Sequence, residues 1–205
     1  MKQTIVAVAA LAASLAFMGN SHAQTQVGQP APQFSAVDTA GKAVSLSEFK
    51  GKYVVLEWTN PDCPFVQKHY NSGNMQATQK HAAGKGVVWL SVNTTGGAQQ
   101  DPKLSAELAS WVKAQKATPT ALLMDGGKLG QAYGAKTTPH MYLIDPSGKL
   151  VYAGAIDSKP SANAGDIATS TNYVTQAINE TAAGKPVSKP VTGAYGCSVK
   201  YASAG

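Results

Sequence analysis

The chain has two cysteines, and these are the side chains best suited to covalent chemistry. Cys63 stands in the stretch Asn-Pro-Asp-Cys-Pro, where an apolar segment typical of a strand meets a segment typical of a helix. The amino end of a helix carries about half a positive charge and several unpaired N–H groups, which favour a thiolate over a thiol. Position alone also allows an inert, buried cysteine at this junction. The second cysteine, Cys197, lies in a tail rich in proline and glycine.

The elements that must position Cys63 alternate between strand-like and helix-like patterns. Apolar runs predict buried strands at 53–58, 87–92 and 121–124, and helical spacing predicts helices at 64–83, 104–116 and 172–183. A hairpin is expected around residues 38–41 and another around 145–148. This order predicts an α/β sandwich, with a mixed central sheet, helices on both faces, an N-terminal β-hairpin extension and an irregular C-terminal tail.

The first residues have the pattern of a secretory signal peptide. Lys2 supplies a positive charge, residues 5–17 form an apolar run, and Ser21-His22-Ala23 is a small-residue cleavage site. An uncleaved membrane anchor is the alternative, but spanning a bilayer takes about 20 apolar residues. We therefore expect a signal peptide at 1–23, one domain at 24–184, a tail at 185–205 and a periplasmic location without membrane attachment after cleavage.

Composition excludes some classes of function. The formal net charge is +6, yet all 17 basic residues are scattered lysines, and no basic cluster could follow a phosphate backbone. Nucleic-acid binding is therefore not expected. No group of His, Cys, Asp and Glu has metal-ligand spacing, so neither a metal nor another cofactor is expected.

Several segments together resemble a known superfamily. They are "DTAGKAVSLSEFKGKYVVLEW", the strand-to-helix cysteine followed by proline, "KTTPHMYLIDPSGKLVYAGAID" and "AGKPVSKPVTGAYGCSVKY". Their order resembles the thioredoxin-like superfamily, and within it the redoxin or peroxiredoxin-like branch related to alkyl hydroperoxide reductase and thiol-specific antioxidant proteins. The similarity runs from about Val27 to Tyr201 and implies a thioredoxin-like fold.

The resemblance also implies roles for individual residues. Cys63 matches the nucleophilic cysteine, and Pro139 matches a cis-proline that faces this cysteine and binds the substrate backbone. Thr138, His140 and Pro64 are expected beside the substrate for the same reason. Without the resemblance, Pro139 is a proline at the start of a strand, since only about 5% of X-Pro bonds are cis.

Glu57 matches a buried acid of thioredoxins. Burial raises the pKa of a carboxyl, which suits Glu57 to exchange a proton with Cys63. The alternative is that Glu57 faces solvent or pairs with a lysine. His140 could assist proton transfer at the sulfur, whereas His69 is expected off the face of Cys63 by helical periodicity.

The sequence also departs from these families. A thioredoxin would have its second cysteine where Val66 stands, and a copper-delivering relative where Gln67 stands, so Cys197 is the only candidate partner within the chain. Peroxiredoxins have a proline and a threonine where this chain has Leu56 and Asn60, and they use an arginine to hold the thiolate. The sequence contains no arginine, and lysine lacks the planar donor fork, so efficient peroxidase activity is not expected.

Two hypotheses follow. The first is a periplasmic thiol oxidoreductase in which Cys63 attacks a disulfide, a peroxide or an oxidised thiol, and Cys197 resolves the intermediate within a chain or across a homodimer. Its reducing partner is unspecified. The second is a non-catalytic binding module in which the same disulfide is a permanent crosslink, which would stabilise the fold by roughly 4–5 kcal/mol in the chain-entropy model.

Overall fold

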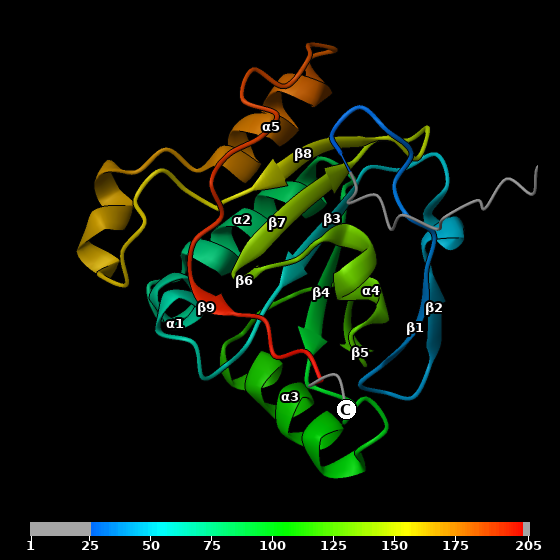
Figure 1. Cartoon of the computed structure of the whole chain (residues 1–205). Helices are drawn as coiled ribbons and strands as arrows, with labels where there is room; N and C mark the ends of the chain where they lie inside the picture. The colour runs from blue at the N-terminus through cyan, green and yellow to red at the C-terminus, as the bar shows by residue number, and fades with distance from the viewer. Residues whose placement is uncertain (1–25, 203–205) are drawn as a thin grey trace, which may run out of the picture.

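Three parallel strands form the centre of the fold. The computed structural model describes residues 26–202, and its main sheet has seven strands in the order β2-β1-β5-β4-β3-β7-β8 (Figure 1). The parallel strands are β3 (Val54–Trp58), β4 (Val88–Thr94) and β5 (Ala121–Asp125), with β4 in the middle. They are apolar almost throughout because helices or loops cover both faces of this part of the sheet.

Antiparallel strands flank this parallel centre on both sides. On one side β7 (His140–Ile144) pairs with β3, and β8 (Leu150–Gly154) pairs with β7. On the other side the N-terminal hairpin of β1 (Ser35–Asp38) and β2 (Ala43–Ser45) joins the sheet through β5. The predicted hairpins and the predicted mixed sheet are confirmed.

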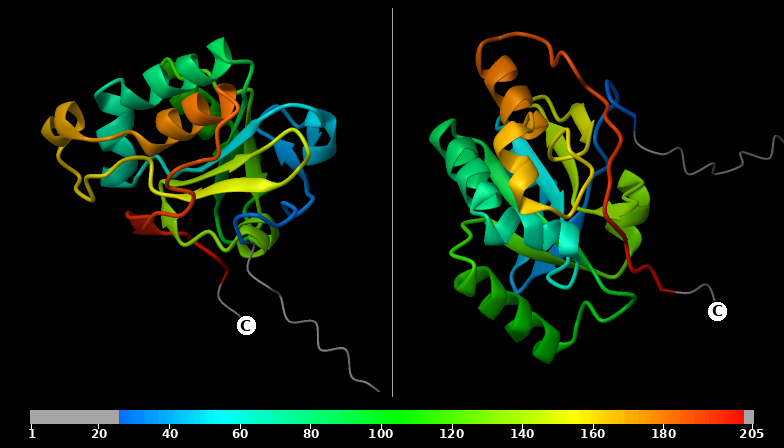
Figure 2. Two further views of the ribbon diagram at one scale, coloured as in Figure 1. Left: turned by 90° about the horizontal axis from the view of Figure 1, so that it is seen from above. Right: turned by 90° about the vertical axis from the view of Figure 1, so that its left-hand side faces the viewer.

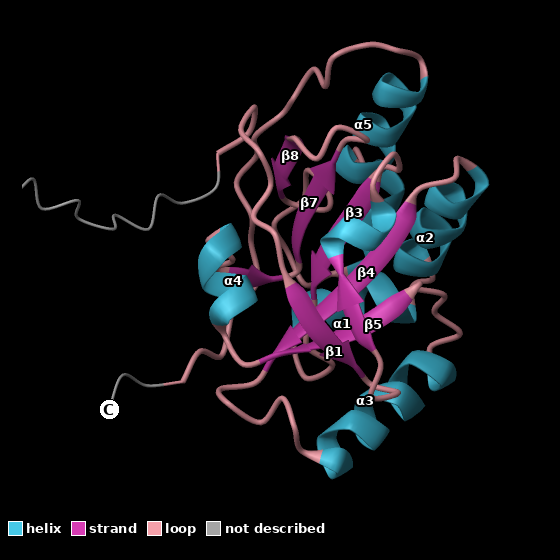
Figure 3. Ribbon diagram, turned by 90° about the vertical axis from the view of Figure 1, so that its right-hand side faces the viewer, coloured by secondary structure: helices cyan, strands magenta, loops and turns pink. Residues whose placement is uncertain are grey.

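Helices cover both faces of the sheet, as the sequence predicts. They are α1 (Pro64–Asn71), α2 (Asn74–Gly84), α3 (Pro102–Ala114), α4 (Lys128–Tyr133) and α5 (Tyr173–Ala182), with short 3₁₀ turns η1 (Leu46–Phe49) and η2 (Ala164–Thr169). Helices α1, α2, α3 and α5 lie on one face, and α4 lies on the other (Figures 2 and 3). The fold is therefore a thioredoxin-like α/β sandwich.

The alternation of side chains along β3 decides which residues can meet the cysteine. Leu56 and Trp58 pack into the apolar cluster on the α4 face, whereas Val55 packs into the cluster on the α1 face that includes Cys63. Glu57 has the same parity as Val55, since successive side chains in a strand point to opposite faces. The acid and the cysteine therefore lie on the same side of the sheet.

The expected single helix from 64 to 83 is wrong, because the structure divides it into α1 and α2. The break is at Ser72 and Gly73, where Gly73 has a φ of 76°, in the left-handed region that glycine adopts without steric cost. Ser72 donates a hydrogen bond from its hydroxyl to the Lys68 carbonyl at 2.7 Å, which satisfies one of the free carbonyls at the end of α1.

The C-terminal tail is mostly irregular, as predicted, but it is not detached. Strand β9 (Cys197–Ser198) pairs antiparallel with β6 (Thr137–Thr138), and this pairing sets Cys197 opposite Thr138. The red segment of Figure 1 shows this tail running from α5 past β6.

The expected signal peptide at 1–23 lies outside the described residues. Between residues 26 and 202, the structure has no helix of the length and apolar character that crossing a membrane requires.

Candidate redox site

Cys63 occupies the residue that caps the amino end of α1. Its backbone is extended, with φ −83° and ψ 120°, and Pro64 begins the helix at a position where its missing N–H costs nothing. The Cys63 carbonyl accepts the first intrahelical hydrogen bond from the Gln67 N–H at 2.9 Å. The sulfur therefore lies beside the positive end of the helix dipole, which stabilises a thiolate when the cysteine is reduced.

Cys63 and Cys197 form a disulfide, with 5.9 Å between their Cα atoms. The bond between Thr138 and Pro139 is cis, as the resemblance implies. The loop that contains it faces the cysteine, because the Thr138 carbonyl oxygen lies 3.0 Å from the Cys63 sulfur. The structure thus brings together Cys63, Cys197, Thr138 and Pro139, which come from α1, the tail and the loop before β7.

Glu57 is fully buried and receives three hydrogen bonds. The Tyr70 hydroxyl donates to Oε1 at 2.8 Å, while the Trp89 indole N–H and the Ser91 hydroxyl donate to Oε2 at 2.8 and 2.9 Å. Burial raises the pKa of the carboxyl, and these hydrogen bonds partly oppose the shift. The alternative of a solvent-facing or lysine-paired Glu57 is therefore wrong. Within residues 26–202 no direct hydrogen bond joins Glu57 to Cys63.

His140 lies near the proline loop, but its ring bonds elsewhere. Nδ1 lies 3.1 Å from the Tyr142 hydroxyl and accepts the Lys136 N–H at 3.3 Å. Burial lowers the pKa of His140 to about 4, with a smaller contribution from the charge of Lys136, so the ring is neutral near pH 7. His140 pairs with Trp58 across the sheet, and both have the parity that faces α4, away from the cysteine.

The structure also contains a buried polar cluster that sequence reasoning missed. Lys68 of α1 forms a salt bridge of 3.3 Å with Asp157, and both side chains are 0% exposed. The Tyr195 hydroxyl, two residues before Cys197, donates to Asp157 and lies 3.4 Å from the Lys68 ammonium. The His69 Nε2 lies 3.2 Å from the same hydroxyl. We call these four residues the tail latch, because they fix the tail to α1.

Further contacts hold the tail on both sides of Cys197. The Tyr201 hydroxyl donates to the Ala135 carbonyl at 2.6 Å. Gly196 has a φ of 138° and lies against the Thr138 backbone so closely that a Cβ atom would overlap the Thr138 carbonyl. Tyr195 and Tyr201 therefore dock the tail on both sides of Cys197, and the docking does not depend on the disulfide alone.

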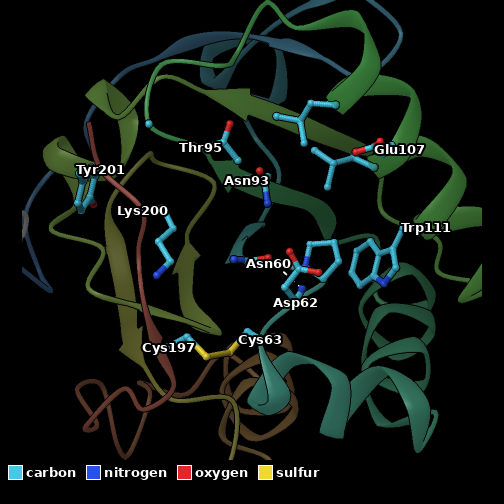
Figure 4. A pocket seen from close by; sticks show the side chains of 14 residues that line it. Asn60, Asp62, Cys63, Asn93, Thr95, Glu107, Trp111, Cys197, Lys200 and Tyr201 are labelled. Carbon is cyan, nitrogen blue, oxygen red and sulfur yellow. Dashed lines mark hydrogen bonds between the residues drawn. A yellow bond between two sulfur atoms is a disulfide. The ribbon is translucent and has the colours of Figure 1, made fainter. Parts of the chain in front are cut away.

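A cavity of about 720 Å³ opens beside the disulfide (Figure 4). Helix α3 and the loops after β3 and β4 provide most of its wall, and the tail closes one side. Both cysteines line the cavity, and Cys197 is the more exposed of the two. Among residues 26–202 no group of three His, Cys, Asp or Glu side chains is arranged to hold a metal ion.

This fold, with a helix-capping cysteine that faces a cis-proline loop, defines a thioredoxin-like redox protein. A model of the AhpC/TSA family matches residues 27–153, more than half of the chain, and the chain therefore belongs to that family.

The chain is also similar to curated relatives and to solved structures. The thiol-disulfide oxidoreductase ResA of Bacillus thuringiensis is 26% identical over 126 residues, which cover 62% of this chain and 68% of ResA. A hypothetical protein of Sinorhizobium meliloti has a solved structure with a TM-score of 0.71 and 25% identity, covering 89% of this chain and 97% of that one. The fold is also shared by a solved structure of a putative thiol:disulfide interchange protein DsbE of Chlorobium tepidum. Its TM-score is 0.52 and its identity 23%, and the match covers 63% of this chain and 85% of the DsbE chain.

Proposed function

We propose that this protein is a thiol–disulfide oxidoreductase that cycles between the Cys63–Cys197 disulfide and the corresponding dithiol. The observation that carries the proposal is the position of Cys63. It is the N-cap residue of α1, and its sulfur faces the loop of Pro139 and is bonded to a cysteine of a separately docked tail. The similarity to ResA supports the same reaction class.

In the reduced protein, the Cys63 thiolate attacks one sulfur of a substrate disulfide and forms a mixed disulfide with it. The other substrate sulfur leaves as a thiolate and takes up a proton. Cys197 then attacks Cys63, which releases the second substrate thiolate and forms the intramolecular disulfide. The tail latch supports this second step, because it keeps Cys197 opposite Thr138, next to Cys63.

The other site residues have supporting roles in this proposal. Glu57, on the same side of the sheet as Cys63, exchanges a proton with the cysteine pair, since its raised pKa leaves it able to accept and donate protons nearer neutral pH. The backbone around Thr138 and Pro139 binds the substrate chain, and Pro64 fixes the start of the helix that stabilises the thiolate. His140 borders this loop, but its ring is bonded on the α4 face.

Peroxide reduction is the weaker candidate. No arginine is present in the sequence to hold a peroxide and a thiolate together, and lysine does not reproduce the bidentate geometry of a guanidinium. We therefore assign disulfide exchange as the main reaction, with a protein or small-molecule disulfide as substrate. We also propose a periplasmic location, with residues 24–184 as the catalytic domain and 185–205 as the tail that carries the resolving cysteine.

The reduction potential of the disulfide tests the proposal. A permanent crosslink has a potential below about −300 mV, whereas a cycling pair has a higher one. We expect a value above that limit, loss of disulfide reductase activity in Cys63→Ser, and trapped mixed disulfides on Cys63 in Cys197→Ser. A potential below −300 mV, together with a strong loss of folding stability on reduction, would instead identify the bond as a crosslink over a sequence separation of 134 residues.

A further inference from the structure

The cavity beside the disulfide has the size of a small-molecule site. Its volume of about 720 Å³ lies within the range of roughly 300–1,000 Å³ that is typical of ligand pockets. Both cysteines line it, and α3 supplies an apolar wall through Leu104, Leu108 and Trp111. A ligand in this cavity therefore lies in contact with the disulfide.

Two buried oxygen atoms in the cavity wall have no hydrogen-bond partner in the described part of the chain. Asn93 is 2% exposed, and its amide N–H donates to the Thr59 carbonyl at 2.9 Å, which fixes the orientation of the side chain. Its Oδ1 atom has no hydrogen-bond partner among residues 26–202, and neither does the buried hydroxyl oxygen of Thr95. Buried polar atoms without partners are costly, so this wall is suited to a ligand that donates hydrogen bonds.

Charges of opposite sign lie at the two sides of the same cavity. Lys200 lies on the side of Cys197, three residues further along the tail, and Glu107 and Trp111 lie across from it, with Asn93 between them (Figure 4). An ammonium group is attracted by a carboxylate, an amide oxygen and the face of an indole ring, and a carboxylate by a lysine. Glu107 also forms an exposed ion pair of 4.0 Å with Lys103, which is weak enough for a ligand ammonium group to compete with. The cavity is therefore complementary to a ligand with an ammonium group and a carboxylate at separate positions.

We propose that this cavity binds a short peptide thiol, whose carboxylate pairs with Lys200 and whose ammonium group lies toward Glu107 and Asn93, and that this thiol reduces the Cys63–Cys197 disulfide. The inference rests on the proposed function and names the reductant class for the same site. The attacked sulfur is that of Cys197, because Cys197 is half-buried whereas Cys63 is 1% exposed.

The reaction consumes two molecules of the thiol. The first, as a thiolate, forms a bond to the Cys197 sulfur while the Cys63–Cys197 bond breaks, and Cys63 leaves with the electron pair as a thiolate at the amino end of α1. A second thiolate attacks the peptide sulfur of the mixed disulfide and expels the Cys197 thiolate. The two peptide thiols end as one peptide disulfide, and the protein gains two electrons and its dithiol.

Three matched thiols test the inference on the full mature chain in its oxidised form. Glutathione carries both charged groups, its glycine ethyl ester lacks the glycine carboxylate, and its N-acetyl derivative lacks the ammonium group. The fraction of reduced protein is measured over time by acid quenching, alkylation of the free thiols and mass spectrometry. We expect the rate to saturate with glutathione concentration, and to be at least about fivefold slower with either derivative at low concentration.

Variants assign each preference to a side chain. Lys200→Gln is expected to abolish the difference between glutathione and its ester, and Glu107→Gln the difference between glutathione and its N-acetyl form. Lys80→Gln removes an exposed lysine of α2 that does not line the cavity. We expect this control variant to keep both the glutathione–ester difference and the glutathione–N-acetyl difference in rate.

Equal, non-saturating rates of reduction by the three thiols would overturn the proposal of a peptide-thiol site. It would also be overturned if Lys200→Gln and Lys80→Gln had the same effect on the ratio of the glutathione rate to the ester rate. Dithiothreitol separates this result from failure of the proposed function, because it reduces a redox-active disulfide without using the charged groups. If dithiothreitol also fails to reduce the folded protein at potentials above about −300 mV, the oxidoreductase proposal itself fails.

Discussion

Removing one hydroxyl from the tail latch should make the disulfide easier to reduce. Tyr195→Phe deletes the hydrogen bond to Asp157 and the contacts with Lys68 and His69. It keeps the ring that packs edge-on against Phe65 at a centroid distance of 5.8 Å. The substitution therefore weakens tail docking through polar contacts and preserves the apolar ones.

The size of the expected change in reduction potential follows from the charge of Asp157, which accepts the Tyr195 hydrogen bond. A hydrogen bond to a charged group contributes about 1.5–3 kcal/mol. The disulfide holds the tail in place in the oxidised protein, whereas the reduced protein can relieve the lost contact by releasing the tail. The dithiol is thereby favoured, and since about 1.4 kcal/mol corresponds to 30 mV for a two-electron couple, the reduction potential should rise by up to roughly 30–65 mV.

The assay is equilibration in dithiothreitol or glutathione redox buffers, with the oxidised fraction measured by alkylation and mass. Tyr53→Phe serves as the matched control, because Tyr53 precedes β3 and is not part of the tail latch. We expect the control to retain the wild-type potential. An unchanged potential in Tyr195→Phe, with an equal loss of stability in both redox states, would refute the idea that docking of the tail adjusts the disulfide.

Further predictions concern the buried charges, the tail glycine and pH. Lys68→Met leaves Asp157 buried without its cation and should lower the free energy of unfolding by about 3–5 kcal/mol in denaturant titrations; a loss below 1 kcal/mol contradicts the buried salt bridge. Gly196→Ala should raise the reduction potential by at least about 40 mV, because the added Cβ overlaps backbone at a left-handed φ; an unchanged potential contradicts the close contact. His69 and His140 have pKa values lowered to about 4 by burial, so their contribution to stability is complete above pH 6.5 and is lost as pH falls toward 4. Protonation of both residues in the unfolded chain should lower the free energy of unfolding by about 3–4 kcal/mol from pH 7 to pH 5, and a flat stability profile over that interval contradicts their neutral, buried state.

Local patterns were sufficient to predict most of the framework. The apolar runs of β3, β4 and β5 and the capping position of Cys63 are properties of short segments, and both are confirmed. The break between α1 and α2 was present in the sequence as Ser72-Gly73, where glycine permits a left-handed residue. The helical pattern continues beyond this pair to Gly84 and Gly86, so the pattern alone predicts one helix.

The position of His140 was also accessible from the sequence. Met141 and Leu143 pack on the α1 face of the sheet, and Tyr142 packs on the α4 face. Strand periodicity then places His140 with Tyr142, on the face opposite Cys63. His140 follows Pro139 directly in the sequence, which suggests a position near the sulfur. The alternation of side chains along β7 instead places His140 on the other face of the sheet.

The tail latch could not be predicted in this way. Its members come from α1, the loop after β8 and the tail, so that Lys68 is 89 residues from Asp157 and 127 from Tyr195. A lysine or a histidine in a short helix carries no local mark of burial, because most such residues are exposed. Only the three-dimensional docking of the tail brings these residues to one point.

The separation of the two cysteines into different structural elements has an evolutionary consequence. When both cysteines belong to one helical turn, any change that adjusts the redox couple also changes the geometry of the nucleophile. Here Cys63, the proposed nucleophile, is fixed at the start of α1, and Cys197 is held by a peripheral segment with its own anchors at Tyr195 and Tyr201. Substitutions in that segment can alter the ease of reduction while the helix, the proline loop and the buried acid stay as they are, so the tail is where the redox properties can change without any change at Cys63.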